Sequence, residues 1–180
     1  IAEEAFQKGA KHVTHLYNAM PPFSHRAPGV IGAACDNENV MVELITDGIH
    51  SHPSTVRTTF KMFGDDRVVL ISDSMMACGL EDGQYTLGGQ DVTVKGNLAT
   101  LTELGNIAGS VTNLMKCMRN GVKEMGIPLE LNFGGIIIGI FDKYGSLVPG
   151  KQADVVVLDK DLEIKYVMKA GKVVYGYDEN

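Results

Sequence analysis

The chain has 180 residues, 44% of them hydrophobic, and a formal net charge of −6. This hydrophobic content is sufficient for a sizeable core, and the acidic balance argues against a general nucleic-acid-binding protein. No apolar run approaches the roughly 20 residues of a membrane-spanning helix, and no signal peptide opens the chain. We therefore expect neither nucleic acid nor a membrane as a partner. Because the chain begins with Ile1 inside a helix-like segment, we expect the natural polypeptide to be longer.

The cysteines indicate a reducing compartment. Cys35, Cys78 and Cys117 are widely spaced, odd in number and form no CxxC pair. This pattern favours reduced thiols and a cytoplasmic protein. The simplest role for each cysteine is that of a small buried hydrophobic side chain.

The first seventy residues alternate between strand-like and helix-like segments. Pro53 and Gly64 mark the expected start and stop of one helix. This rhythm predicts parallel βαβ units. The expected elements are a helix over Ala2–Lys8, strands over Lys11–Leu16, Val40–Thr46 and Arg67–Ser72, a helical turn over Gly29–Asp36 and a helix from Pro53 to Phe63.

After Asp73 the pattern changes to short strands separated by glycine-containing turns. Gly88-Gly89 and Gly96-Asn97 predict antiparallel hairpins, an insertion at about residues 84–102. We expect domains at 1–140 and 141–180. The remaining expected elements are a helix over Val111–Met125 with a core-facing stripe at Leu114, Met115, Met118 and Val122, and strands at Asp154–Leu158, Ile164–Lys169 and Lys172–Tyr175.

Three of the expected parallel strands lead into polar side chains. The first ends at His15, the second leads into Asp47-Gly48-Ile49-His50, and the third leads into Asp73. The carboxyl ends of parallel strands meet at one edge of a sheet, where α/β barrels place their active sites. The sequence therefore predicts one polar site built from successive strand ends.

Four segments carry a family resemblance. Thr14-His15-Leu16-Tyr17-Asn18-Ala19-Met20, Asp47-Gly48-Ile49-His50, Ser72-Asp73-Ser74 and Ala108-Gly109-Ser110 resemble the signature blocks of N-acetylglucosamine-6-phosphate deacetylases, which are metal-dependent members of the amidohydrolase superfamily. The resemblance implies an α/β fold, namely the last three strands of a TIM-like (β/α)8 barrel plus part of a small β-sandwich domain. Residues 131–139 depart from the family pattern, where relatives have a longer helix.

The resemblance also implies catalytic and metal-binding roles. His15 would be a metal ligand, the remaining ligands lying upstream of Ile1, and the divalent ion would be zinc or iron, with one or two ions bound. Asp73 would be the general base and then the general acid, and also a ligand of any second metal. His50 would bind substrate and stabilise the oxyanion, while Asp47 is expected to orient its loop. Without the resemblance, the favoured interpretation of a lone histidine such as His15 is a hydrogen-bonded core residue, and Asp73 could simply cap the turn after its strand.

Substrate recognition requires donors for a phosphate group. Asn18, the backbone N–H of Ala19 and the guanidinium of Arg26 would form a phosphate cradle. The resemblance implies that Ala108 and Gly109 lie against the sugar and that the enzyme is a homodimer. Arg26 alone would otherwise be a solvated surface residue.

These features predict an enzyme that removes acetate from N-acetyl-D-glucosamine 6-phosphate to give D-glucosamine 6-phosphate, in amino-sugar catabolism. One alternative is a deacetylase of another N-acetylhexosamine 6-phosphate, such as N-acetylgalactosamine 6-phosphate. The other is a non-catalytic fragment that binds a sugar phosphate.

Overall fold

The computed structural model describes residues 1–129 and 139–176. The chain forms two compact units, Ile1–Asn132 and Phe133–Asn180. The expected division at residue 140 lies a few residues beyond this boundary and stays a prediction. Most of the atypical stretch 131–139 lies outside the described residues.

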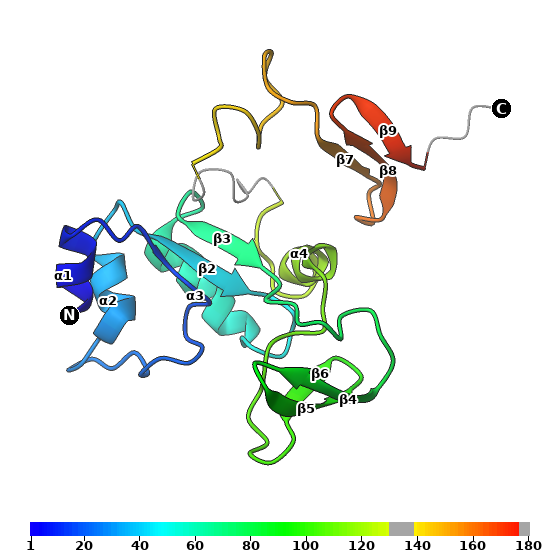
Figure 1. Ribbon diagram of the computed structural model, residues 1–180. Helices are drawn as coiled ribbons and strands as arrows, with labels where there is room; N and C mark the ends of the chain where they lie inside the picture. The colour runs from blue at the N-terminus through cyan, green and yellow to red at the C-terminus, as the bar shows by residue number, and fades with distance from the viewer. Residues whose placement is uncertain (130–138, 177–180) are drawn as a thin grey trace. The chain divides into compact units, whose positions relative to one another are not determined.

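A parallel sheet of three strands organises the first unit (Figure 1). Strand β1 (His12–Val13) pairs with β2 (Met41–Ile45), which pairs with β3 (Val68–Ile71). The strands alternate with helices α1 (Ala2–Gln7), α2 (Gly29–Cys35) and α3 (Pro53–Phe63). The α/β class and the parallel βαβ arrangement expected from the sequence are therefore confirmed.

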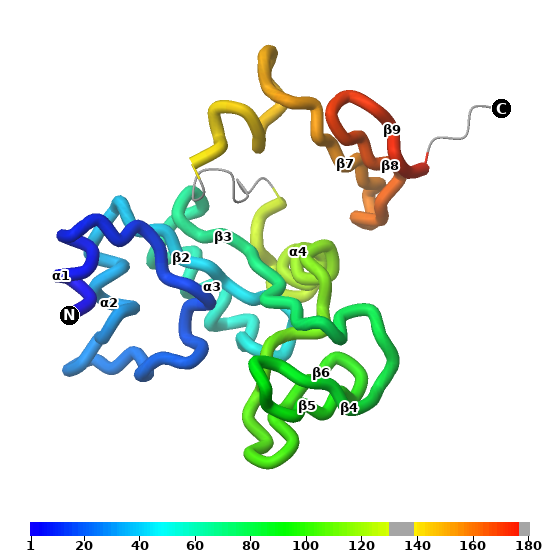
Figure 2. The backbone as a smooth tube through the Cα atoms, viewed as in Figure 1, coloured from blue at the N-terminus to red at the C-terminus, as the bar shows by residue number. Residues whose placement is uncertain are grey.

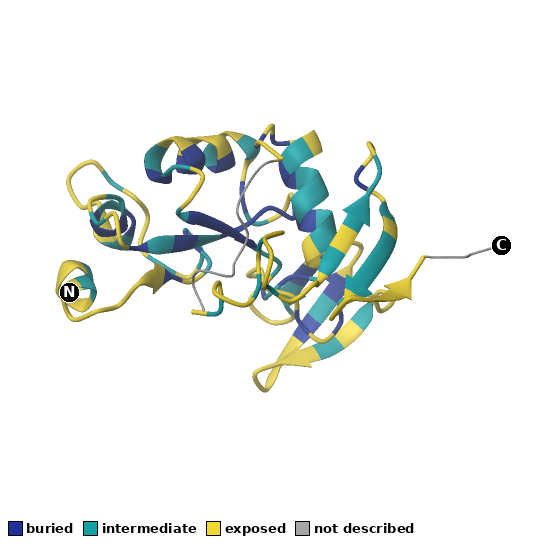
Figure 3. Cartoon of the chain, turned by 90° about the horizontal axis from the view of Figure 1, so that it is seen from above, coloured by how far each residue is buried: buried dark blue, intermediate teal, exposed yellow. Residues whose placement is uncertain are grey.

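The core lies between this sheet and its helices. The alternate residues Val42, Leu44, Val68 and Leu70 are buried in one cluster with Val56 and Phe60 of α3 and Ile31 of α2. Figure 3 shows buried segments (dark blue) along strands of the molecule, and the first three of the four residues of β3 are buried. The opposite face of β2 presents Met41 and Glu43, which are only half-buried. The helices thus cover one face of the sheet. The polar residues that follow the three strands lie beyond the carboxyl ends of these strands.

The first strand is shorter than expected. It ends at Val13 rather than Leu16, because the backbone enters a turn in which His15 has a left-handed φ of 33°. Figure 2 shows the long loop that follows, up to α2. Because of this turn, His15 lies two residues beyond the end of its strand. The same spacing separates Asp47 from the end of β2 and Asp73 from the end of β3.

A second sheet follows the parallel one. Strands β4 (Gly83–Leu87), β5 (Gln90–Lys95) and β6 (Leu98–Leu101) pair antiparallel in sequence order. The left-handed φ angles of Gly88 and Gly89 form the β4–β5 turn, as the sequence predicts. Val92, Val94 and Ala99 form its small core with neighbouring residues.

Helix α4 (Leu114–Lys123) is shorter than the expected helix and buries a different face. It begins where the Asn113 side chain accepts a hydrogen bond from the Lys116 N–H, 2.9 Å away. The expected core stripe is wrong at Leu114, which is 50% exposed, because the buried positions are Cys117 and Gly121.

The second unit contains one antiparallel sheet in its described part. It comprises β7 (Val155–Leu158), β8 (Ile164–Lys169) and β9 (Lys172–Tyr175). These strands match the expected ones, and they account for one sheet of the expected sandwich. Over the described ranges, no helix is long and apolar enough to cross a membrane.

Candidate active site

The segment after β2 is a tight turn built around one carboxylate. Asp47 Oδ1 accepts hydrogen bonds from the backbone N–H groups of Ile49 at 2.9 Å and His50 at 3.0 Å. Its other oxygen, Oδ2, lies 2.8 Å from His50 Nδ1. The expected role of Asp47 in orienting its loop agrees with these contacts, and its bond to the His50 ring is an addition that the sequence did not reveal.

The Asp47 carboxylate is ionised although it is buried. Its side chain is 1% exposed, and burial alone would raise its pKa. Hydrogen bonds from the His50 ring and from the N–H groups of His50 and Ile49 outweigh burial and lower the pKa to about 2. At neutral pH this turn therefore holds a fixed negative charge directly beside the imidazole.

Ser110 connects this turn to the chain after β3. Its hydroxyl donates a hydrogen bond to Asp47 Oδ2 at 3.2 Å and accepts one from the Thr112 N–H at 3.0 Å. The Ser110 N–H donates to the Asp73 carbonyl at 2.9 Å. Ser110 is 1% exposed, so one buried residue joins the backbone of the expected acid/base to the turn that holds the expected oxyanion residue.

Asp73 presents its side chain to solvent. It lies two residues after β3, with a left-handed φ of 50°, and it is exposed. A left-handed φ in a non-glycine residue is strained and recurs at functional sites. Its backbone is fixed by Ser110, whereas its carboxylate is accessible for proton transfer.

The expected sugar-contacting loop passes beside Asp73. Ala108 is buried, and its N–H donates to the Ala99 carbonyl at 3.0 Å, which leaves it unavailable to a ligand. Gly109 has a φ of 64°, and a Cβ there would lie 3.4 Å from both Leu87 Cδ2 and Met75 Cβ. Side chains of this chain thus approach Gly109 closely, and its expected contact with the sugar stays a prediction.

The loop after β1 has an unusual backbone. His15, Tyr17 and Ala19 all have left-handed φ angles, of 33°, 76° and 52°. The segment is held by Glu43, whose carbonyl accepts from the Leu16 N–H at 2.8 Å and whose carboxylate accepts from the His15 N–H at 3.3 Å. The N–H groups of Tyr17 and Asn18 are also used inside the loop, where they donate to Met20 Sδ at 3.3 Å and to the His15 carbonyl at 2.9 Å.

Tyr17 anchors this loop to α3. Its hydroxyl lies 2.7 Å from Thr59 Oγ1, and Thr59 Oγ1 donates its own proton to the Thr55 carbonyl at 2.8 Å. Tyr17 is therefore the donor. Burial raises the pKa of Tyr17, against the lowering effect of the Thr59 hydrogen bond.

The expected phosphate-binding residues lie in the same loop and differ in burial. Asn18 is half-buried, and its side-chain amide donates to the Leu16 carbonyl at 3.2 Å. Ala19 and Arg26 are exposed, and Arg26 lies within the short bridged turn Ser24–Ala27. The contacts within the described ranges do not bring Arg26 and Asn18 together, so their convergence stays a prediction.

The donor atoms in this chain fit part of a metal site. His15 Nδ1 is buried and lacks a hydrogen-bond partner within the described part of the chain. Such an orphaned nitrogen is suited to a ligand or a metal. Among the described residues, no three His, Cys, Asp or Glu side chains gather closely enough to hold an ion. His15 therefore fits as one ligand of a set that these residues do not complete.

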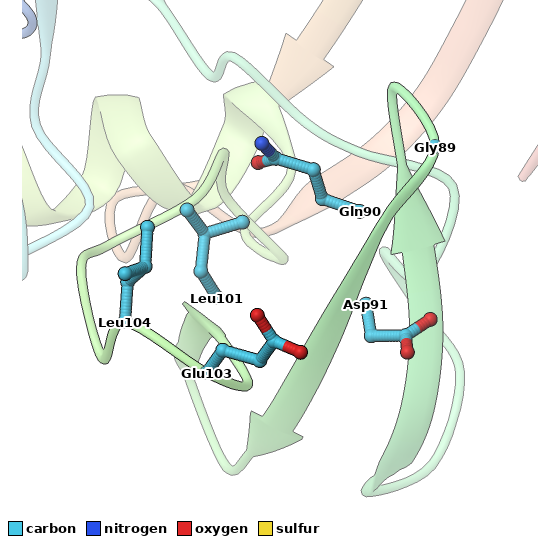
Figure 4. Close-up of a pocket in the computed structure, with 6 residues that line it drawn as sticks. All are labelled: Gly89, Gln90, Asp91, Leu101, Glu103 and Leu104. Carbon is cyan, nitrogen blue, oxygen red and sulfur yellow. The ribbon is translucent and has the colours of Figure 1, made fainter.

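A hollow of about 230 Å³ lies elsewhere, on the β4–β6 sheet (Figure 4). It is lined by Gly89, Gln90, Asp91, Leu101, Glu103 and Leu104. None of these is a predicted site residue, and the two carboxylates would repel a phosphate. We do not assign the substrate to this hollow.

Several contributors were missed because their roles depend on distant partners. Ser110 is 63 positions from Asp47, and Asn120, whose side chain donates to the Asp47 carbonyl at 2.9 Å, is 73 positions away. For Glu43, the sequence did contain a signal of its role. It is a lone carboxylate within an otherwise apolar strand, and a glutamate is almost never fully buried unless it has a partner.

A model of the amidohydrolase family matches residues 1–174 of the chain. The chain belongs to the amidohydrolase family. This amidohydrolase chain is 40% identical to an N-acetylglucosamine-6-phosphate deacetylase of Bacillus subtilis, over 97% of the chain and 46% of the relative. It is 36% identical to an N-acetylgalactosamine-6-phosphate deacetylase of Escherichia coli O157:H7, over 94% of the chain and 46% of that protein.

A solved structure supports the same family assignment. The structure of a mutant N-acetyl-D-glucosamine-6-phosphate deacetylase from Mycobacterium smegmatis, in complex with N-acetyl-D-glucosamine-6-phosphate, matches with a TM-score of 0.89 and 34% identity. The match covers 96% of this amidohydrolase chain and 48% of the other. The chain thus spans about half the length of the relatives it matches. The resemblance predicted from the sequence motifs is confirmed.

Proposed function

We propose that this protein removes acetate from N-acetyl-D-glucosamine 6-phosphate, giving D-glucosamine 6-phosphate, as part of amino-sugar catabolism. The observation that supports this most strongly is Ser110, which hydrogen-bonds both the Asp73 backbone and the Asp47 carboxylate beside His50. A proton-transferring carboxylate and an imidazole at the same edge of a sheet suit hydrolysis of an amide.

In the proposed reaction, Asp73 accepts a proton from the attacking water and later passes it to the departing amine. His50 donates a hydrogen bond to the oxygen of the acetamide carbonyl as negative charge develops there. The water oxygen becomes part of acetate, and the amine nitrogen of the sugar takes the transferred proton. A divalent ion, zinc or iron, held in part by His15 and by Asp73 if two ions bind, supplies Lewis acidity when present.

For the substrate's phosphate, we propose Asn18, the Ala19 N–H and Arg26 as the binding group. The exposure of Ala19 and of Arg26 supports this assignment, because both can reach a ligand. Gly109 would pass over the sugar ring, with Ala108 supporting it. We further propose a homodimer in the cytoplasm, consistent with the three unpaired cysteines.

The test is acetate release by the full chain from N-acetylglucosamine 6-phosphate, with zinc or ferrous iron supplied. The unphosphorylated sugar is the substrate control. Asp73→Asn should lower kcat by at least about 100-fold, whereas Asp65→Asn, which changes an exposed residue, should leave it unchanged. Release that requires no phosphate group, or full activity in Asp73→Asn, would contradict the proposal.

Two other functions are distinguished by experiment. The similarity to an N-acetylgalactosamine-6-phosphate deacetylase raises the epimeric substrate, and the ratio of kcat/KM for the two sugar phosphates separates these activities. The other alternative is a non-catalytic sugar-phosphate-binding protein. Saturable binding without acetate release or bound metal would favour that function.

A further inference from the structure

The hydrogen-bond pattern around Asp47 decides which nitrogen of His50 carries a proton. A neutral imidazole has one proton, on Nδ1 or Nε2, and its neighbours determine the site. His50 Nδ1 lies 2.8 Å from Asp47 Oδ2, and the His50 side chain is only 6% exposed. The ring therefore cannot exchange this partner for water without moving.

Asp47 has no proton to give to the ring. Its pKa of about 2 keeps it ionised, and both of its oxygens already accept hydrogen bonds from other donors. An ionised carboxylate is an acceptor only. The hydrogen between Asp47 and His50 must therefore belong to Nδ1.

Ser110 fixes the direction of the chain of hydrogen bonds. The Thr112 N–H occupies Ser110 Oγ as a donor, so the hydroxyl proton is directed to Asp47 Oδ2. Asn120 holds the same turn from α4 through the Asp47 carbonyl. The carboxylate is thus held from two sides and cannot rotate away from the imidazole.

We propose that Asp47 is a positioning residue that keeps a proton on His50 Nδ1 and presents Nε2 as the working nitrogen, and that Ser110 orients the Asp47 carboxylate for this role. This inference rests on the proposed function for what Nε2 then does. With Nδ1 protonated, the neutral ring can only accept at Nε2, so a His50 that donates to the acetamide oxygen must carry both protons. The Asp47 carboxylate offsets the resulting positive charge.

The direct test is nitrogen-15 magnetic resonance of the full chain, using long-range correlations between ring protons and ring nitrogens. His50→Gln assigns the His50 signals among the five histidines. The expected result is a protonated Nδ1, whether the ring is neutral or charged. An unprotonated Nδ1 would overturn the proposal.

Two variants and a matched control separate positioning from folding. Asp47→Asn should move the ring toward the form protonated on Nε2 alone, and Ser110→Ala should leave Nδ1 protonated. Asp91→Asn, which alters an exposed carboxylate on β5, should leave the protonation of both His50 ring nitrogens as in the wild type. If Asp47→Asn does not fold, the wild-type and Ser110→Ala spectra still decide the question.

Kinetics give a second measurement on the same variants. Asp47→Asn should lower kcat by at least about 100-fold with KM little changed, since replacing the carboxylate of the Ser-His-Asp triad by an amide costs about 10⁴-fold. Ser110→Ala should lower kcat about fivefold, the loss of one hydrogen bond. A protonated Nδ1 without acetate release would refute the proposed function alone, and release with an unprotonated Nδ1 would refute this inference alone.

Discussion

The buried charge of Asp47 predicts a specific pH dependence of stability. Folding lowers the pKa of this carboxyl from 3.8 to about 2. A group with a lowered folded pKa stabilises the native state at pH values above its unfolded pKa and loses that contribution as the pH falls through the folded pKa. Asp47 should therefore contribute fully at neutral pH and progressively less below pH 4.

The size of this contribution follows from the two pKa values. Their difference corresponds to about 2 kcal/mol at pH 7, of which about 1 kcal/mol remains at pH 3. Since the side chain is only 1% exposed, solvent screening should reduce these values little. The amide that replaces this carboxyl in the Asp47→Asn variant cannot ionise. The difference in unfolding free energy between wild type and variant should therefore shrink by about 1 kcal/mol from pH 7 to pH 3.

The assay is urea unfolding followed by far-ultraviolet circular dichroism. All four helices described lie in the first unit, so the signal mainly reports on the unit that contains Asp47. Other carboxylates titrate in both proteins and cancel in the comparison. An equal difference in unfolding free energy at both pH values would refute the assignment of a buried, ionised Asp47.

Three further predictions concern the framework around the site. Arg67 donates to five carbonyls, which belong to Phe63 at the end of α3, to Ala34 and Cys35 at the end of α2, and to Asn37 and Val40 between α2 and β2. Arg67→Ala should therefore lower the free energy of urea unfolding by about 3 kcal/mol, and Arg67→Lys should recover only part of it because an ammonium lacks the guanidinium fork; equal stability of the two variants would contradict this. Tyr17→Phe should cost about 1 kcal/mol, because Thr59 keeps its own bond to Thr55; an unchanged unfolding free energy would count against the anchor. Burial raises the pKa of the Cys117 thiol to about 12. Iodoacetamide should therefore label the half-exposed Cys78 in the native protein and Cys117 only in urea, as measured by mass spectrometry. Labelling of Cys117 in the native protein would disprove its burial.

Local signals predicted the fold well where the decisive interactions are local. Helix α3 runs from Pro53 to Phe63, and Gly64 ends it with a left-handed φ, as its proline and glycine signals indicate. His52, which gave no functional signal, accepts from the Ser54 N–H at 3.2 Å at the start of this helix. Backbone propensity alone is enough to place such boundaries.

Propensity failed where tertiary contacts override it. The segment Val13–Leu16 was expected to continue the first strand, but Glu43 accepts hydrogen bonds from the N–H groups of His15 and Leu16 where the chain turns. The apolar pattern predicts that the largest apolar residues of α4 face the core, but Gly121 is one of its buried positions. A Cβ there would lie 2.6 Å from Ile127 Cδ1, so close packing favours the smallest residue.

The imidazoles of His15 and His50 differ in whether this chain supplies a hydrogen-bond partner for Nδ1. His50 has an ionised partner on Nδ1, itself held by Ser110 and Asn120, so its orientation is determined by residues of the chain. His15 Nδ1 is buried without a hydrogen-bond partner in the described ranges. A buried polar atom left unpaired costs about 1–3 kcal/mol, which a ligand would recover. Metal binding should therefore stabilise the loop around His15 and leave the His50 turn unchanged, because Asp47 already occupies His50 Nδ1 whereas, within the part of the chain described, His15 Nδ1 is free to bind.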